Sequence, residues 1–415
     1  MTKNIAIIGS DINGVLGSAS QFANCGARVT LFLRNSKPHD CDVAVVTTNS
    51  KLVTASQAYH KTKNAVRKCR GRQIYLQEDS SLRGNLPSSI KAVIDELNPR
   101  KVLICLSLPE KKRHVQGGRV YIDGIPADKS IAGGDPLSPV KESHIPTLIY
   151  KSTGIKSKVL GFDIIDKGPS AILKHSMDTN ERIIVLDALE VQHFRHIAGA
   201  IQLGGNECFT CMTNSLSREL PFVHGYSRDD LKAVQPLENK KPVLVVVGSY
   251  EATAGVQLCR ANEKTGLPVI SVETTGLLSL QKRDDIIREY YQMVTEKLET
   301  GTNIAITSNS SRYIYQLRYK MAYLLAKIAA EAVYRCNPGA LLTGGSDTTY
   351  ALCNTLQVQK IDVLGSIRTG VSTIISMLHT RNGKLLYMGS RGGAIGGPEE
   401  ILETLKILRP HQSIQ

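Results

Sequence analysis

The sequence predicts two α/β domains with mainly parallel sheets and a ligand cleft between them. Short apolar runs alternate with helical segments in both halves of the 415-residue chain, which is the pattern of parallel sheets. A polar stretch over Ser227–Pro242 separates the halves, so we expect domains over residues 1–230 and 240–415. Several apolar runs end in glycine-rich turns, where open α/β sheets bind ligands.

The composition favours a soluble cytoplasmic protein. The chain is 42% apolar and 21% charged, as in globular proteins, and no apolar run approaches the length of a membrane span. Residues 5–8 are too short an apolar stretch for a signal peptide. The nine cysteines, an odd number, indicate reduced thiols. Cys208 and Cys211 form the sole C-x-x-C pair; zinc or redox chemistry is an alternative there, but two buried small residues are the favoured interpretation.

The net charge of +14 is compatible with nucleic acid, an anionic surface or an acidic small substrate as partner. The densest basic stretch, Lys61–Arg72, has no aromatic platform or nucleic-acid motif, so it predicts a solvated helix face. We therefore expect no nucleic-acid or membrane partner, and a site for phosphates and carboxylates would use part of the excess charge. A homo-oligomer is one option that the sequence leaves open.

The N-terminal segment resembles a dinucleotide-binding opening. A strand over Ile5–Ile8, a turn, a helix to about Cys25 and a strand over Val29–Leu33 follow one another. The G-x-G-x-x-G pattern fails at Asp11, where a carboxylate would face the pyrophosphate, and Arg34 stands where an acid would hold the ribose. An NADP site remains an alternative, whereas Asp11 is better suited to a hydroxyl or a cation.

The remaining elements follow from apolar periodicity and turn signals. Further strands are predicted at Val43–Thr48, Gln73–Gln77, Val102–Leu106, Ile183–Leu186, Val243–Val247 and Ile304–Ser308, with a hairpin arm at Val120–Pro126. Helices are predicted at Ala55–Cys69, Ser89–Leu97 and Leu317–Ala332.

Two polar loops follow strands in the first half. Glu78–Asn85 contains charged and hydroxyl side chains at a strand's carboxyl end, which is typical of a ligand loop. The structural alternative makes Asp79 a helix cap and Arg83 a surface residue. Pro109–His114 is a basic loop in the same topological position.

Glycine turns in the second half predict a nucleotide cradle. Leu341–Thr349 is an apolar run that ends in two glycines and opens a helix, a geometry that offers backbone N–H groups to phosphate. Gly389–Pro398 is a second glycine cluster, and Arg368–Val371 lies between the two. Asp347 is suited equally to a metal ion and to a helix cap. Ordinary strand–helix turns are the alternative to the cradle.

In order and spacing, these motifs resemble those of the four-carbon acid sugar kinases, formerly a domain-of-unknown-function family, over nearly the whole chain. The family's D-D-x-T-G-A, D-S-T-x-R/K-G-N, proline-loop-G-R and D-P-x-x-P motifs correspond to Ser10–Val15, Asp79–Asn85, Pro109–Arg113 (Lys112 replacing the glycine) and Asp135–Pro139. Its G-S, G-G-[DE]-T and K-x-G-x-F-G turns correspond to Gly248-Ser249, Gly344–Thr348 (one extra residue) and Arg391–Gly396.

The resemblance implies an ATP-dependent kinase that phosphorylates a hydroxyl of a tetronate or 3-oxo-tetronate in carbohydrate catabolism. The N-terminal domain would bind the sugar acid, and the C-terminal domain would bind ATP with Mg²⁺ at Asp347. Asp11 and Arg83 are the implied catalytic residues, Asp11 orienting or deprotonating the attacking hydroxyl. The implied substrate-binding residues are Asp79, Ser80, Arg83, Asn85 and Arg113, and the implied nucleotide-binding residues are Ser249, Gly344, Gly345, Asp347, Thr348, Gly370, Arg391, Gly392, Gly393 and Gly396.

The chain departs from the family pattern mainly on the sugar side. Ser10 replaces one of the two opening aspartates, Asn13 stands in place of threonine, and no glycine-serine-glycine turn is recognisable near Glu207–Asn214. Two other function classes therefore stay open: an NADP-dependent oxidoreductase, and a non-catalytic ligand-binding relative of the kinases.

Overall fold

Each half of the chain folds around its own sheet. The computed structural model describes residues 4–34, 38–272, 280–308 and 318–410. It divides into two units, Met1–Leu231 (unit 1) and Lys232–Gln415 (unit 2).

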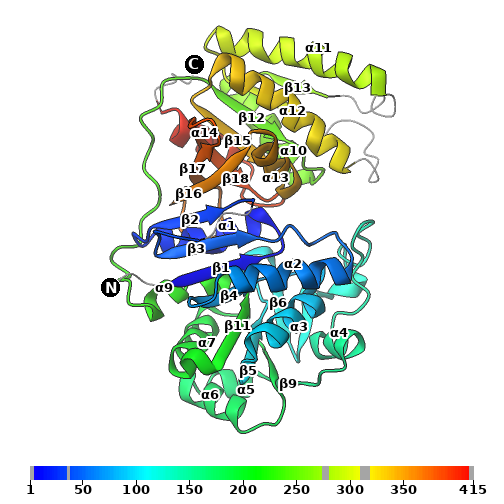
Figure 1. Ribbon diagram of the computed structural model, residues 1–415, viewed down its shortest axis with the longest axis vertical. Helices are drawn as coiled ribbons and strands as arrows, with labels where there is room; N and C mark the ends of the chain where they lie inside the picture. Colours follow the sequence, from blue (N-terminus) through cyan, green and yellow to red (C-terminus); the bar gives the residue numbers. More distant parts are fainter. Residues whose placement is uncertain (1–3, 35–37, 273–279, 309–317, 411–415) are drawn as a thin grey trace. The chain divides into compact units, whose positions relative to one another are not determined.

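The described strands of the unit 1 sheet all run parallel to their neighbours, and Figure 1 labels most of them. Their order across the sheet is β2 (Val29–Phe32), β3 (Val43–Thr47), β1 (Ile5–Gly9), β4 (Gln73–Gln77), β11 (Cys208–Met212), β5 (Lys101–Cys105), β10 (Ile183–Leu186) and β9 (Ser157–Leu160). Most strand residues are buried apolar side chains, as expected for a parallel sheet covered on both faces.

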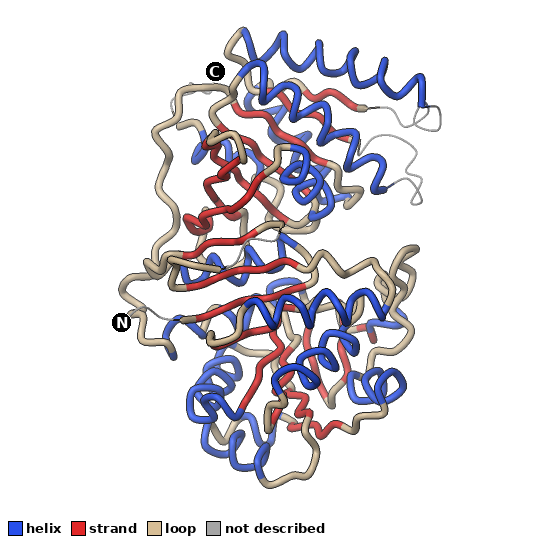
Figure 2. Tube along the Cα trace, in the orientation of Figure 1, coloured by secondary structure: helices blue, strands red, loops and turns tan. Residues whose placement is uncertain are grey.

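Helices cover both faces of this sheet (Figure 2). On one face, Ala6 and Ile8 of β1 join a core with side chains of α2 (Ala55–Lys68), α3 (Leu86–Leu97) and α4 (Ile145–Thr153). On the other, α1 (Ile12–Ala23) contacts β1, α8 (Asn214–Ser217) and α9 (Leu220–Val223). The remaining helical segments are α5 (Phe162–Ile165), α6 (Pro169–Met177), α7 (Val191–Gly204), η1 (Pro109–Lys111), η2 (Ala127–Lys129) and η3 (Gly205–Glu207).

A small antiparallel sheet follows β5. It consists of β6 (Arg113–Gln116), β7 (Arg119–Ile122) and β8 (Ile125–Pro126). Its inward side chains belong to the same core as α3 and α4.

Unit 2 has a mixed sheet. In spatial order its strands are β13 (Val269–Ser271), β14 (Ile304–Thr307), β12 (Val243–Val247), β15 (Ala340–Gly344), β18 (Leu385–Arg391), β17 (Ile374–Thr380) and β16 (Val358–Ser366). The first five are parallel, while β17 is antiparallel to both of its neighbours. The helices are α10 (Ala252–Thr265), α11 (Leu280–Glu299), α12 (Arg318–Cys336), α13 (Ser346–Thr355) and α14 (Glu400–Leu408).

The α/β architecture with mainly parallel sheets is confirmed, with local differences. Helix α3 begins at Leu86 rather than Ser89 because Pro87 is accommodated in its first turn. Helix α12 continues to Cys336, since buried alanines and Val333 extend its apolar face; Leu317, the expected start, lies outside the described residues. The β16–β17 hairpin was not predicted.

Other expectations concern cysteines and membranes. Cys208 and Cys211 are buried free thiols on β11, and burial raises the pKa of both, to about 11 for Cys208. No helix among the described residues is long and apolar enough to cross a membrane.

Candidate functional site

Strands β3, β1 and β4 are parallel neighbours, so their carboxyl ends meet at one edge of unit 1. Asp11 follows β1 and caps helix α1, its Oδ1 accepting a hydrogen bond of 2.7 Å from the Gly14 N–H. A Cβ at Gly14 would lie 2.5 Å from the Gln77 Oε1, so a larger residue here would displace the amide end of Gln77. One carboxylate oxygen of Asp11 thus caps the helix, and the second faces Lys51.

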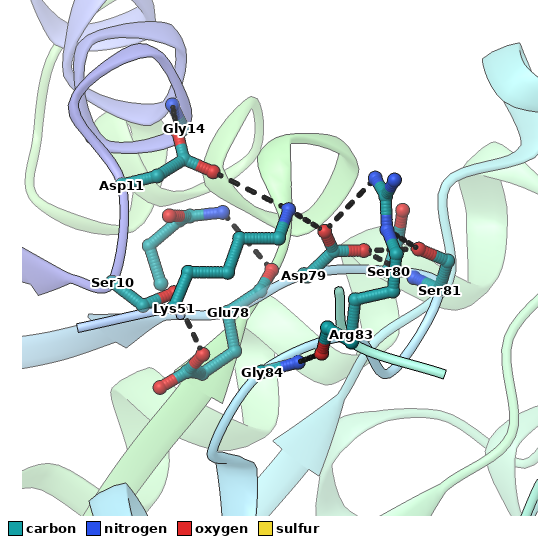
Figure 3. Close-up of polar contacts among 12 residues, drawn as sticks. Ser10, Asp11, Gly14, Lys51, Glu78, Asp79, Ser80, Ser81, Arg83 and Gly84 are labelled. Atoms are coloured by element: carbon teal, nitrogen blue, oxygen red, sulfur yellow. Dashed lines mark hydrogen bonds and ion pairs between the residues drawn. The ribbon is translucent and has the colours of Figure 1, made fainter. Parts of the chain in front are cut away.

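Lys51, which sequence reasoning missed, links two aspartates at this edge (Figure 3). Its Nζ lies 3.8 Å from the Asp11 Oδ2 and forms an ion pair with Asp79. The one available signal was its position directly after the polar loop that ends β3.

Asp79 lies in the turn that follows β4 with its side chain only 7% exposed, and its Oδ1 accepts a 2.7 Å hydrogen bond from the Ser81 N–H. Burial on its own would raise the pKa of this carboxyl, but the charges of Arg83, Lys51 and Arg113 together hold it well below its usual value. Asp79 is therefore an ionised group throughout the physiological range.

Arg83 contacts Asp79 and Ser81, as Figure 3 shows, and also Asp135. Its Nη2 lies 3.2 Å from the Asp79 Oδ2, its Nε donates to the Ser81 Oγ at 3.0 Å, and its Nη1 donates to the Asp135 Oδ2 at 3.3 Å. Asp135 is held in turn by the N–H groups of Leu137 and Ser138, at 3.0 and 2.9 Å. The guanidinium plane is thus oriented from two segments far apart in the sequence.

Arg113, at the start of β6, reaches the same turn. Its Nη1 donates to the Ser80 Oγ at 2.9 Å. The structure therefore gathers Lys51, Arg83 and Arg113 around Asp79, and we call these three residues the cationic cluster. Because guanidinium groups pair with carboxylates and phosphates in a planar fork, the arrangement is suited to an acidic ligand.

Asn85 holds a neighbouring loop in place through its side-chain amide. Its side-chain amide donates to the carbonyl oxygens of Ser50 and Val53, at 2.9 and 3.0 Å. These bonds hold the loop that carries Lys51, so Asn85 positions one member of the cationic cluster.

Glu78, also missed, is buried beside Ser10, whose hydroxyl donates to its Oε2 at 3.0 Å (Figure 3). Burial raises the pKa of Glu78 to about 7, against the opposing effect of hydrogen bonds from Ser89 and Ser10. Its place immediately before Asp79, at the tip of β4, was the only sequence signal. A carboxyl that titrates near neutral pH thus adjoins one that stays ionised.

In unit 2, neighbouring strands β12, β15 and β18 are parallel and end at one edge. A Cβ at Gly248 would lie 2.2 Å from the Thr348 Oγ1, and a Cβ at Gly393 would lie 1.9 Å from the Ser249 Oγ. The turns after the three strands are therefore in close contact, and a Cβ at either glycine would displace a neighbouring side chain. We call the segments 248–249, 344–348 and 391–396 the glycine cradle.

Helix α13 opens within the glycine cradle. Gly345 precedes it with φ of 106°, a conformation that favours glycine, and its N–H donates to the Arg391 carbonyl at 3.0 Å. Asp347 is half-buried in the first turn and Thr348 is buried. Gly344 ends β15 at the same edge.

Arg391 is buried and braces its own turn. Its Nη1 donates to the Ile395 carbonyl at 3.2 Å. Burial lowers its pKa to about 10, opposed by Glu400, so the guanidinium stays protonated at neutral pH. Gly392 follows it, and Gly396 has φ of 83° with the Glu400 side chain 2.3 Å from where a Cβ would lie.

Gly370, with φ of 100°, lies in the loop between β16 and β17 and not at the end of a parallel strand. This loop is fastened to α14: Arg368 forms ion pairs with Glu400 and Glu403, and the Thr373 N–H donates to the Glu400 Oε1 at 2.7 Å. Glu400 thus links the loop of Gly370 to the glycine cradle.

Among the residues that the structure describes, no group of three His, Cys, Asp or Glu side chains could hold a metal ion. Asp347 is a single carboxylate at the entry of a helix. One carboxylate is nevertheless a fitting donor for Mg²⁺ when nucleotide phosphates and water supply the other ligands.

Two family models match the chain. The sugar-binding N-terminal domain matches residues 5–220, more than half of the sequence, and the nucleotide-binding C-terminal domain matches residues 244–401.

Curated relatives span most of the chain at low identity. A D-erythronate kinase of Heliobacterium modesticaldum is 24% identical, with 87% of each chain covered. A D-threonate kinase of Bordetella bronchiseptica is 23% identical over 98% of this chain and 97% of the relative. A 3-oxo-tetronate kinase of Cupriavidus necator is 21% identical over 90% and 88%.

Solved structures share the fold. A Salmonella typhimurium LT2 protein superposes with a TM-score of 0.79 at 17% identity, covering 99% of both chains. A Haemophilus influenzae protein superposes with a TM-score of 0.72 at 17% identity, covering 97% of this chain and 100% of its own. At this identity the likeness concerns the fold alone.

Proposed function

The chain belongs to the four-carbon acid sugar kinase family, and from that premise we propose that it transfers the γ-phosphate of ATP to a hydroxyl of a four-carbon sugar acid. The observation that carries the proposal for this chain's own residues is the cationic cluster: Lys51, Arg83 and Arg113 surround an ionised Asp79 at the carboxyl edge of the unit 1 sheet.

The acid carboxylate is assigned to Arg83 and Arg113. Both guanidinium groups contact the 79–81 turn, and paired N–H donors match a carboxylate in geometry as well as charge. Asp79 and Ser80 would receive hydroxyl groups of the sugar chain, since ionised carboxylate and hydroxyl oxygens accept hydrogen bonds. Asn85 takes part indirectly, through the loop of Lys51.

Asp11 is assigned to the attacking hydroxyl. Its Oδ1 is engaged by the Gly14 N–H, so the Oδ2, which faces Lys51, is the oxygen that would accept the hydroxyl proton. The hydroxyl oxygen bonds to the γ-phosphorus, the bond to the ADP oxygen breaks, and the proton passes to the carboxylate. Phosphoryl transfer depends mainly on such positioning and on cancellation of charge.

ATP is assigned to the glycine cradle. The N–H groups that open α13 and the close turns at Ser249, Gly345 and Gly393 provide a surface for phosphate oxygens. Asp347 is the residue that would hold Mg²⁺, which when bound neutralises charge on the phosphates. Gly344, Thr348, Gly370, Arg391, Gly392 and Gly396 shape or brace this surface.

The substrate is a tetronate or 3-oxo-tetronate. Three kinases with different named substrates resemble the chain at 24%, 23% and 21% identity, so identity does not choose among them. We expect that ADP release with Mg²⁺ and ATP is stimulated by at least one of D-erythronate, D-threonate and 3-oxo-tetronate in a coupled assay.

A phosphorylated acid detected by mass spectrometry identifies the substrate. ATP binding without transfer to any of these acids would instead favour a non-catalytic relative, a reading that Ser10, in place of the family's first aspartate, makes worth testing. Binding of NADP in preference to ATP would overturn the kinase proposal.

A further inference from the structure

The β6–β7 hairpin of unit 1 is a ribbon with two chemically distinct faces. Side chains alternate along each strand, and the register pairs His114 with Tyr121 and Gln116 with Arg119. The intervening residues Val115, Val120 and Ile122 are buried in the unit 1 core. His114, Gln116, Arg119 and Tyr121 therefore share the opposite face.

This outer face lines a hollow. The hollow has a volume of about 560 Å³ and is bordered by His114, Gln116, Gly117, Arg119, Tyr121, Gly124 and His144. Its size lies within the range of roughly 300–1,000 Å³ for small-molecule sites. A second hollow shares His114 and Gly124 and extends toward Lys112 and Arg113.

The walls of the hollow carry donors in fixed positions. The His114 ring stacks on Tyr121 with centroids 5.2 Å apart and planes 11° apart. Arg119 donates through Nη1 to the Ser143 Oγ at 2.5 Å, and its backbone bridges to His144. The His144 Nδ1 lies 2.7 Å from the Thr147 Oγ1, which leaves Nε2 as the ring nitrogen that can face a ligand.

The carboxylates near the hollow form hydrogen bonds or ion pairs with other groups. Asp187 accepts hydrogen bonds from the N–H groups of Gly117 and Gly118, at 2.5 and 2.9 Å. Glu142 pairs with Lys151 at 3.0 Å and accepts from the His144 N–H. Among the described residues, Arg119 forms no ion pair, although its charge is close enough to Glu142 to help lower the pKa of that carboxyl.

We propose that this hollow, separate from the cationic cluster, binds the phosphate group of a small molecule. A guanidinium fork and two imidazole rings offer several N–H donors to one group, which suits the three oxygens of a phosphate better than the two of a carboxylate. The hollow exceeds the size of a bare ion, so a phosphorylated sugar acid fits as well as inorganic phosphate. The site goes beyond the proposed kinase reaction and does not depend on it.

Protonation of the two histidines should accompany binding. Burial lowers the pKa of His114, opposed by Asp187, and lowers that of His144, together with Arg119 and against Glu142 and Asp187. A bound dianion favours the charged imidazolium, so binding should be accompanied by proton uptake by the protein.

The test is calorimetric titration without ATP. Inorganic phosphate, 3-phosphoglycerate and unphosphorylated glycerate are titrated into the full chain. We expect binding of at least one phosphate-bearing probe and none of glycerate. Arg119→Gln can still donate to Ser143 but lacks the charge, and it should weaken binding roughly tenfold or more; His144→Asn provides a second, independent variant.

The controls separate this site from the others. Arg100→Gln removes an exposed arginine that pairs with Glu207 and should leave phosphate binding unchanged. The proposal fails if phosphate binding is abolished by Arg83→Gln but unaffected by Arg119→Gln and His144→Asn, or if glycerate binds as tightly as 3-phosphoglycerate. Loss of kinase activity alone would not contradict this proposal, because the titration measures binding and requires no phosphoryl transfer.

Discussion

Asp79 and Glu78 are adjacent residues whose carboxyl pKa values are shifted in opposite directions. Asp79 is held ionised by Arg83, Lys51 and Arg113 despite its burial, whereas Glu78 contacts the Ser10 hydroxyl and has a pKa of about 7. The difference arises from which side chains converge on each carboxyl. Neighbouring carboxyl groups commonly have different pKa values where a site must keep one of them charged and the other neutral.

Glu78 predicts a pH dependence of stability. A carboxyl whose pKa is raised in the folded state contributes stability that is complete below its unfolded pKa and is lost as pH rises through the folded pKa. The window therefore runs from 4.5 to about 7. Glu78→Gln should gain on the order of 3 kcal/mol relative to the parent protein across this window.

Thermal unfolding of both proteins from pH 4.5 to 8 measures the effect. Glu207→Gln, which removes an exposed carboxylate, controls for net charge. If the midpoints of Glu78→Gln and the parent protein run parallel across the whole range, Glu78 is not a buried titrating group.

At the residue scale, sequence reasoning found the side chains that follow strand ends within recognisable loops. Asp79, Arg83 and Arg113 were named, and the structure brings them together. Lys51 and Glu78 were missed because their roles depend on partners far away in the chain: Lys51 meets Asp79 from another loop, and Glu78 meets Ser10 from another strand. No local pattern encodes such contacts.

At the scale of elements, the glycine cradle depends on three turns that touch. Gly345 is a poor position for a test substitution, because its φ of 106° would strain any side chain whether or not ATP binds there. Gly393 is a better position for this test, because its φ lies outside the left-handed region and an added Cβ would lie 1.9 Å from the Ser249 Oγ.

Gly393→Ala should push the turn after β18 away from Ser249 and weaken ATP binding at least roughly tenfold, a loss of about 1.4 kcal/mol. Gly397→Ala is the matched control, since nothing lies within 4 Å of its added Cβ. Fluorescence titration with a labelled ATP analogue compares the two. Equal affinities in Gly393→Ala and Gly397→Ala would place the nucleotide elsewhere.

Strands and helices were largely predictable because buried parallel strands read as continuous apolar runs. Strands β4, β10 and β12 begin and end where the sequence indicated. The β16–β17 hairpin was missed, and the loop of Gly370 was assigned to the cradle. This loop joins antiparallel strands and reaches the cradle through Glu400, a buried contact that spacing along the chain does not reveal.

For the whole molecule, the ordered motif set carried more information than composition. The net charge of +14 was compatible with several classes of partner. The structure shows that three of the positive side chains, Lys51, Arg83 and Arg113, lie around one turn. Each unit has its own apolar core, so each can present a ligand surface at the carboxyl edge of its sheet. We propose that Asp11 and the cationic cluster together serve phosphoryl transfer to a sugar acid.

Single-turnover phosphorylation by the parent protein and by Asp11→Asn tests this claim most directly. Asparagine caps a helix about as well as aspartate, so folding and ATP binding should survive. Transfer from ATP to the best tetronate should fall roughly 10²-fold or more, the usual scale for a general base. Transfer at the parent rate by Asp11→Asn would contradict the account and leave Asp11 as the cap of α1 alone.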